Sequence, residues 1–526
     1  MTLTTFIDRL DDWINPIAVK ELRQVVKSRL VTVILMVFLF LMLFVMGINL
    51  LFTQSSVGDP RGMAGGRSVF IAFQTILLPT LMLVIPIYAA ARMSSERSET
   101  NVDLLFISAL SPSSIILGKF VAALMIAILI FSIFAPFMLF TYLLRGVDLS
   151  MIIYVLIVDI MAMLGATIFA LFLGSISCGR GLKIFVNLVG FYGVFNIWIV
   201  LMTYTNMVIS GEFFGSDEWS FLVLGTVWAL LECFLLYSYA IALISSPSSN
   251  RMLPVRLAQL SFWFMSILVL FVYILLSPVL GFSQVRLVIG FWFGINMFHL
   301  SIYYVIATCE RTECGPRIAR TIPKNQLWRT LGFLLYTGSA GGVLFTLIFM
   351  VLTLFIVFLL QYEMFGLPIK DLIDFIAIWS IIAVYTICYC QSAALIRYYF
   401  LKNQINPAYT WVLGLVLLAI GIFVPSVFAI IFNISTNYEF SMWMIPNPFI
   451  AVITIPKYGF DHIIWYLMLL FLVIWLALLA LASIPWLRVQ IKQFVPFTKK
   501  PILVPQWMDA LPVEDADPTS IKPEGT

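Results

Sequence analysis

The sequence predicts an all-α, polytopic membrane protein with about twelve transmembrane helices, arranged six plus six, and an interfacial helix at the N-terminus. The first observation is composition: 62% of the residues are hydrophobic, 11% are charged, and the mean hydropathy is +1.05. Soluble globular chains lie far from these values. The second is a series of long apolar runs, and the third is the placement of basic residues between them.

Twelve apolar runs are long enough to cross about 30 Å of hydrocarbon. We expect spans near residues 30–52, 68–92, 117–143, 150–174, 183–209, 219–244, 257–277, 286–307, 331–360, 372–398, 408–433 and 462–486.

The basic residues give this set of spans an orientation. With the N-terminus placed inside, 24 of the 30 basic residues fall in cytoplasmic segments. Such a split follows the positive-inside rule. It predicts a multi-pass protein of the plasma (inner) membrane with both termini cytoplasmic. The six basic residues outside this group are Arg61, Arg67, Arg145, Arg286, Lys370 and Lys457.

Residues 1–29 precede the first span and contain a predicted amphipathic helix. Asn15 caps this helix and Pro16 opens it, because proline fits a first helical turn that needs no backbone donor. At about 100° per residue, polar and apolar side chains occupy opposite faces. We expect the helix to lie in the membrane interface, with membrane lipids as its partner. The apolar face holds Ala18, Val19, Leu22, Val25 and Val26, and the polar face holds Lys20, Glu21, Arg23, Gln24 and Lys27.

The chain divides at the turn-rich segment 245–256 into two six-span domains, residues 30–250 and 256–490. The proline-containing tail, residues 491–526, is predicted to be disordered and cytoplasmic. A short repeat links the halves: ERTE at 310–313 follows the second span of the second half, as ERSE at 96–99 follows the second span of the first. Chance similarity remains an alternative for four residues.

A polar interruption at 92–119 separates the second and third spans. It is charged first and apolar afterwards, and Ser111 is placed to cap a helix that begins at Pro112. This pattern predicts a short helix at the membrane surface followed by a sharp entry into the next span. Docking of another protein and an ordinary solvated loop are both consistent with it.

Two parts of the first half resemble the ABC-2 type permeases, the membrane subunits of ATP-binding cassette exporters. The segment NPIAVKELRQVVKSR resembles the N-terminal signature of that family, and SSERSETNVDLLFISALSPSSIILGKF resembles its first cytoplasmic loop. Asn101 departs from the pattern, since the family often has threonine there. The second half resembles the family only at Asn447, Pro448 and Phe449. The matching residues are Asn15, Pro16, Lys20, Glu21, Arg23, Glu96, Arg97, Asp103, Leu104, Leu105, Pro112, Gly118 and Lys119.

The resemblance implies an exporter-type fold in which residues 30–250 form the permease domain, with an elbow helix before them and a coupling helix in the first cytoplasmic loop. A separate ATP-binding cassette ATPase would be the partner. The sequence contains no G-x-x-x-x-G-K-[ST] motif, so ATP hydrolysis is expected on another subunit, and this chain is expected to be neither an enzyme nor cofactor-dependent. The residues implied in coupling are Lys20, Glu21, Arg23, Glu96, Arg97, Asp103, Leu104 and Leu105.

Ionisable residues inside spans are candidates for a functional role. Asp159 in the fourth span and Glu232 in the sixth are predicted to line a pathway or to form polar contacts between helices. His299 and His462 are in no catalytic or metal-binding motif, and we expect ordinary interface roles for both. No metal site and no nucleic-acid partner are predicted.

Two other function classes stay open: a non-transporting membrane scaffold with a permease fold, and a membrane-embedded lipid-modifying transferase. The number of chains in the assembly is also open. Glu310, Arg311 and Glu313 are interpreted as a degenerate second ATPase contact, which favours one chain acting as both halves. The rival is a complex that contains a second permease chain.

Overall fold

The computed structural model describes twelve stretches of the chain. They are residues 16–54, 65–96, 111–144, 147–176, 179–210, 216–246, 248–276, 282–364, 370–401, 404–431, 444–452 and 463–496. All regular elements within these stretches are helices.

The first half begins with a short helix and continues with six spans. The short helix is α2 (Pro16–Val26), and the spans are formed by α3 (Arg29–Gln54), α4 (Gly65–Pro79) with η2 (Thr80–Val84) and α5 (Ile85–Glu96), α7 (Pro112–Leu143), α8 (Leu149–Ser175), α9 (Arg180–Ser210) and α10 (Ser216–Ile244).

The second half also has six spans, and two short helices interrupt it. The spans are α11 (Leu253–Leu276), α12 (Phe282–Thr308), α15 (Ser339–Met364), α16 (Lys370–Tyr399), α17 (Thr410–Ile431) with the preceding turn η3 (Pro407–Tyr409), and α19 (Ile463–Gln493); the short helices are α13 (Pro316–Thr321) and α14 (Gln326–Leu335).

Twelve of the described helical segments are long and apolar enough to cross a membrane, which confirms the all-α polytopic prediction. The second span is continuous across a π-helical turn, η2. This turn lies between Pro79 and Pro86, whose missing amide hydrogens interrupt the regular hydrogen-bond ladder.

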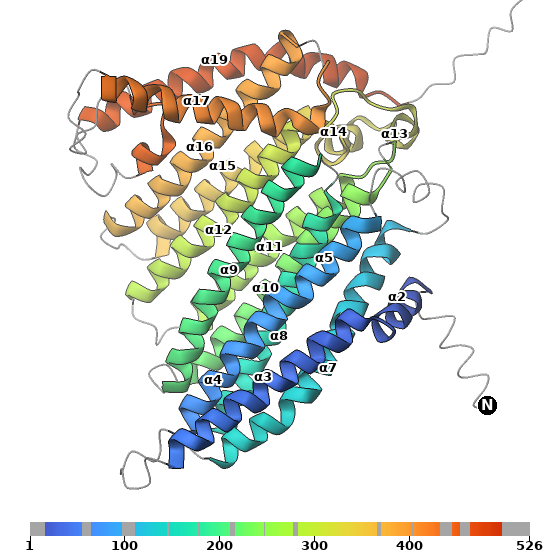
Figure 1. Cartoon of the computed structure of the whole chain (residues 1–526). Coiled ribbons are helices and arrows are strands. Elements are labelled where there is room, and N and C mark those ends of the chain that lie inside the picture. Colours follow the sequence, from blue (N-terminus) through green and yellow to red (C-terminus); the bar gives the residue numbers. More distant parts are fainter. Residues whose placement is uncertain are drawn as a thin grey trace, which may run out of the picture.

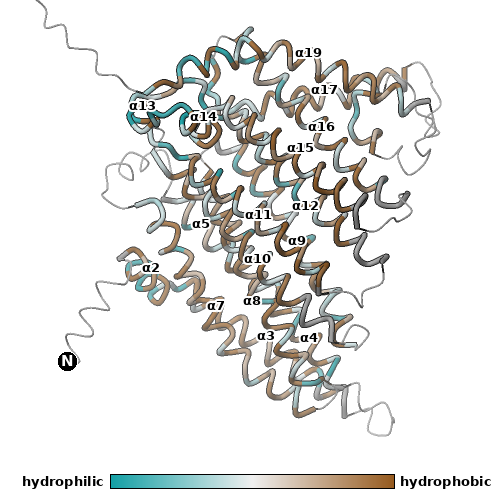
Figure 2. Tube along the Cα trace, turned by 180° about the vertical axis from the view of Figure 1, so that it is seen from behind, coloured by the Kyte–Doolittle hydropathy of each residue, from teal (hydrophilic) through white to brown (hydrophobic). Residues whose placement is uncertain are grey.

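In Figure 1, α3, α4 and α7 of the first half lie at the lower side of the molecule, and α15, α16, α17 and α19 of the second half lie at the upper side. The hydrophilic parts of the trace gather at α2 and at α13 and α14, while brown, apolar stretches run along the long helices (Figure 2). These hydrophilic short helices mark one end of the apolar bundle, as expected for a chain that crosses a membrane repeatedly.

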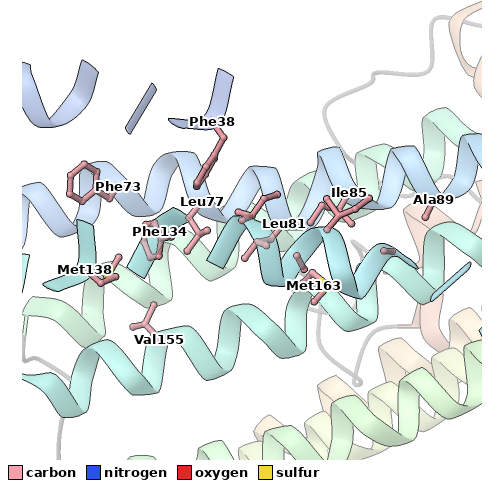
Figure 3. Packing of buried hydrophobic residues seen from close by; sticks show 14 of the residues in the cluster. Phe38, Phe73, Leu77, Leu81, Ile85, Ala89, Phe134, Met138, Val155 and Met163 are labelled. Carbon is pink, nitrogen blue, oxygen red and sulfur yellow. The ribbon is translucent and has the colours of Figure 1, made fainter. Parts of the chain in front are cut away.

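Two large apolar cores and two smaller clusters of buried residues hold the described helices together. In the first half, side chains of α3, α4, α7 and α8 interdigitate, with Phe38, Phe73, Phe134 and Val155 among them (Figure 3). The second core joins α11, α12, α15 and α16. Helix α10 contributes to both, because Ala240 packs into the first core while other α10 residues pack into the second. The two halves are thus continuous through α10.

The structure corrects three predicted boundaries. The ninth span begins at Ser339 and not near 331, because α14 ends at Leu335 and a turn separates the two helices. Helix α11 begins at Leu253, which places Arg256 inside a helix and not in the connection between the halves. Helix α19 continues to Gln493, three residues into the predicted tail, and residues 497–526 of that tail lie outside the described residues.

Candidate functional site

Helix α2 is attached to the third span by a buried ion pair. The Lys119 ammonium lies 3.0 Å from a carboxylate oxygen of Glu21, and the two side chains are 2% and 4% exposed. Lys119 donates a hydrogen bond across this contact. The pair joins residues that are 98 positions apart in the sequence. It therefore brings together the two segments whose motifs stand out in the first half.

Gly118, the neighbour of Lys119, allows α2 to approach α7 closely. A Cβ atom added at Gly118 would lie 2.7 Å from Cγ2 of Ile17 and 3.1 Å from the backbone nitrogen of Ala18. Side chains of normal size therefore do not fit at this crossing. The start of α7 is fixed as predicted: the Ser111 hydroxyl accepts a hydrogen bond from the Ser114 amide, and Pro112 is the first helical residue.

Arg92 adds the end of the second span to this junction. Its guanidinium lies 3.9 Å from the second carboxylate oxygen of Glu21 and donates a hydrogen bond to Gln24. It also lies over the ring of Tyr88, 6.0 Å from the ring centre. We call the contact region of α2, α5 and α7 the α2 junction. An open depression of about 650 Å³ at its surface is lined by Val19, Lys20, Arg23, Gln24, Lys27, Ser28 and Arg92.

The predicted coupling residues are distributed unevenly over this junction. Lys20 and Arg23 are exposed and line the depression, whereas Glu21 is buried. Glu96 is the last residue of α5. Asn15 and the remaining predicted coupling residues, Arg97, Asp103, Leu104 and Leu105, lie outside the described residues.

The predicted facing of α2 is wrong at Glu21. Glu21 was expected among the headgroups, but it points into the protein because Lys119 neutralises it there. Val26, on the predicted apolar face, is 77% exposed from the protein, which agrees with a side chain that faces the acyl boundary. Ala18 and Val25 of the same face are buried against the protein, so the side of α2 that faces α7 is mixed in character.

A second buried ion pair lies at the corresponding place in the other half. Two carboxylate oxygens of Glu310 accept hydrogen bonds from Nη2 of Arg256, at 2.8 and 2.6 Å. The two side chains are 0% and 1% exposed. Burial raises the pKa of Glu310, and the charge and hydrogen bonds of the Arg256 guanidinium oppose that rise.

The remaining donors of Arg256 bind Tyr303 of α12 and the chain that enters α15. Its Nε donates to the Tyr303 hydroxyl at 2.7 Å, and its Nη1 donates to the carbonyl oxygens of Leu334, at 2.9 Å, and Tyr336. Its Nη2 also donates to the carbonyl oxygen of Gly338, whose own amide donates to Glu310. We call this set of contacts the Arg256 cluster.

Glycine in α15 makes room for the Arg256 cluster. A Cβ atom at Gly342 would lie 2.8 Å from Nη2 of Arg256 and 3.0 Å from a carboxylate oxygen of Glu310. Glu310 is therefore not exposed to an ATPase, because it is buried and paired with Arg256, and the predicted second contact is left to its neighbours. Arg311 and Glu313, the neighbours that share its motif, are exposed.

The two intramembrane acids have different surroundings. Asp159 is buried, and one of its oxygens accepts a hydrogen bond from the Gln74 side chain at 2.5 Å, which joins α8 to α4. Glu232 lies 2.9 Å from Nε2 of His299, which joins α10 to α12 and hence the first half to the second. Asp159 is thus a helix contact, and Glu232 is a contact that also faces a cavity.

That cavity has a volume of about 950 Å³ and lies among α8, α9, α10 and α12. Its wall is mostly apolar, and it includes Glu232 and His299 but not Asp159. Within the described part of the chain, no group of three or more His, Cys, Asp or Glu residues is placed to hold a metal ion.

Sequence reasoning missed the importance of Lys119 and His299. In both cases a signal was present. Lys119 lies at the cytoplasmic end of the third predicted span, near the interface where the helix with Glu21 was expected, and His299 lies inside the eighth span, as Glu232 does in the sixth. An ionisable residue at membrane depth is expected to have a partner of this kind.

Comparison with protein-family models, with curated proteins and with solved structures gives no match for this chain. The contacts of the chain itself therefore carry the functional argument.

Proposed function

We propose that this chain is the permease subunit of an ATP-driven exporter and that a separate ATP-binding cassette ATPase binds at the α2 junction. The observation that carries the proposal is the buried Glu21–Lys119 pair. It unites the segment that resembles an elbow helix with the end of the segment that resembles a coupling loop. Lys20 and Arg23 stand on the outer side of the same helix, where an acidic protein surface would meet them.

The same contacts suit the transmission of force. A push on α2 reaches α7 directly, because Gly118 leaves no space between the two helices and the ion pair resists sliding. Arg92 passes the displacement to the end of α5. Rigid-body movement of packed helices of this kind is a common basis for switching between two states.

In this proposal the membrane is the plasma (inner) membrane, and both termini and α13–α14 are cytoplasmic. The support is the distribution of basic residues, 24 of 30 on one side. The hydrophilic ends of the trace at α2 and α13–α14 are consistent with this orientation (Figure 2).

The number of permease chains follows from the contrast between the halves. An exporter needs two ATPase contacts, because its two ATPase subunits close on each other. The α2 junction supplies one, and Glu310 is enclosed in the Arg256 cluster and supplies none. We therefore propose two copies of this chain per complex, each with one α2 junction.

Charge reversal on the α2 surface tests the proposed contact. The chain is co-expressed with an ATP-binding cassette ATPase of the same genome, and the amount of ATPase recovered with the purified permease is measured. We expect Lys20→Glu with Arg23→Glu to reduce recovery at least about tenfold, because like charges then oppose across the interface. ATP hydrolysis that depends on the permease should fall in parallel.

The matched control reverses two exposed basic residues of the second half, Arg317→Glu with Lys324→Glu. Recovery should remain that of the unaltered chain. Equal losses in both double variants, or none in either, would refute docking at the α2 junction. Native mass spectrometry of the intact complex counts its subunits, and a single permease chain beside two ATPases would refute the two-copy arrangement.

A further inference from the structure

The 950 Å³ cavity among α8, α9, α10 and α12 has the size and lining of a ligand site. Pockets for small molecules measure roughly 300–1,000 Å³ and combine apolar walls with a few polar groups. Helix α9 forms one wall of the cavity through Gly190, Gly193 and Tyr204. Most α9 side chains are not buried by the protein, so this wall borders the bilayer. An occupant can therefore enter from the lipid.

The polar end of the cavity is the contact between Glu232 and His299. Nδ1 of His299 faces the carbonyl oxygen of Ile295 at 2.8 Å, and because a carbonyl only accepts, Nδ1 carries a hydrogen. Nε2 faces Glu232 at 2.9 to 3.1 Å, so these two groups share one further proton. The pair has no net charge, whichever of the two groups holds that proton.

A primary ammonium group matches this arrangement. It carries three N–H donors, and it can donate to the Glu232 carboxylate and to Nε2 of His299 once the shared proton has left to water. The charge then balances, because one cation replaces one proton. Glu232 lies near the middle of the span Leu222–Ile244, so only a head attached to an apolar body would reach it.

Aromatic rings also line the cavity. Phe298 is next to His299 in the chain, Tyr239 lies on α10, and Phe172 of α8 contacts the Tyr239 ring at 6.0 Å between centres. The faces of such rings attract a cation within about 6 Å. Apart from Thr226, the rest of the wall consists of glycine and of apolar and aromatic side chains such as Met82, and there an alkyl chain would be free of water.

We propose that this cavity binds a membrane-derived amphiphile with a primary-ammonium head and an alkyl chain, the head at Glu232 and His299 and the chain between α8 and α9. Binding of this kind goes beyond the proposed exporter function and does not depend on it. The site would hold its ligand in the absence of any ATPase.

Photolabelling of the purified full-length chain tests the proposal. The protein is placed in phosphatidylcholine nanodiscs with a diazirine-bearing long-chain alkylamine, and a second sample receives the alcohol of identical chain. Labelled peptides are located by mass spectrometry. We expect the amine to label peptides of α8, α9 and α10 at the cavity, and to do so at least about tenfold more than the alcohol, since a charged hydrogen bond distinguishes them.

Three variants sharpen this test. Glu232→Gln should reduce amine labelling to the level of the alcohol. Gly193→Leu should reduce the labelling of α8 and α10 by both probes, because a Cβ at Gly193 meets no atom within 4 Å and the added side chain fills the cavity without disturbing the fold. Asp159→Asn, a change at a buried acid that does not line the cavity, should leave labelling unchanged.

Amine labelling that is the same in Glu232→Gln and in the unaltered chain would overturn the proposed head-group site. Labelling that Gly193→Leu leaves unchanged would overturn the cavity as the site. Because Gly193→Leu fills empty space, it decides the question even where Glu232→Gln lowers the yield of folded protein.

Discussion

The two halves of the molecule each bury a carboxylate–cation pair where the sequence shows polar motifs, yet the two pairs have different surroundings. In the α2 junction, Lys119 and Glu21 meet beside an open basic depression. In the Arg256 cluster, the pair is enclosed, and the arginine also binds Tyr303 and backbone carbonyls. Both pairs are buried, but the exposed charges of Lys20 and Arg23 lie beside the first, whereas the second is enclosed by its own hydrogen-bond partners.

The difference shows what each pair does for the fold. The Arg256 cluster fixes the path from α14 into α15, because Arg256 binds the carbonyls of Leu334, Tyr336 and Gly338 together. The α2 junction fixes only a short helix at the edge of the bundle. A local element of this sort can move or detach at a free-energy cost below that of global unfolding. We therefore expect damage to the Arg256 cluster to be global and damage to the α2 junction to be local.

The largest effect is expected for Glu310→Gln. The substitution keeps the shape of the side chain but leaves the Arg256 charge buried without a counter-ion, which costs about 3–5 kcal/mol in comparable pairs. Thermal unfolding of the detergent-purified chain would measure this loss. Glu313→Gln, at an exposed position three residues away, should change stability by less than about 0.5 kcal/mol. Equal stability of the two variants would remove the distinction between the halves.

A smaller effect is expected for Lys119→Met. The variant leaves the Glu21 carboxylate buried, with the Arg92 guanidinium at 3.9 Å as its remaining cation. If α2 detaches from α7, the Glu21 carboxylate returns to water. The variant can therefore lose no more stability than the free energy with which α2 binds to the bundle. Hydrogen exchange of α2 amides should accelerate at least about tenfold, while exchange in α8 stays unchanged. Lys27→Met, at an exposed position just after α2, is the control; faster exchange in both variants would contradict a specific role for the pair.

Much of the fold follows from the sequence because membrane insertion acts on single segments. Each long apolar run forms a helix of its own, and the basic residues between runs set the orientation. The helix start at Pro112 could also be predicted from the sequence, since a Ser-Pro step is a local signal. The start of the ninth span could not: the apolar residues up to Leu335 belong to α14, and only the contact of Arg256 with the turn after it reveals the break.

The candidate site was harder to predict from the sequence, because its contacts join residues far apart in the sequence. Periodicity placed Glu21 on the polar face of α2, and only Lys119, 98 positions later, explains why it is buried. Glu310 looked like a surface charge for the same reason, until Arg256, 54 positions earlier, is placed beside it. An isolated helix pattern cannot distinguish a charge that faces solvent from one that faces a partner of opposite charge.

The smallest effect, and the one that most sharpens the comparison, is expected for Gly118→Ala. The new Cβ would lie 2.7 Å from Ile17 Cγ2, so α2 must shift outward at a cost of about 1–2 kcal/mol, in the range of modest overpacking. Gly47→Ala, on α3, is the matched control, because a Cβ there meets no atom within 4 Å. If an ATPase acts on the bundle through α2, Gly118→Ala should leave the global unfolding temperature unchanged, accelerate hydrogen exchange of α2 amides and reduce the amount of ATPase recovered. Gly47→Ala should change none of these three quantities. Faster exchange with undiminished recovery would mean that the ATPase does not depend on the close contact of α2 with α7, and the local nature of the α2 junction would then have no bearing on coupling.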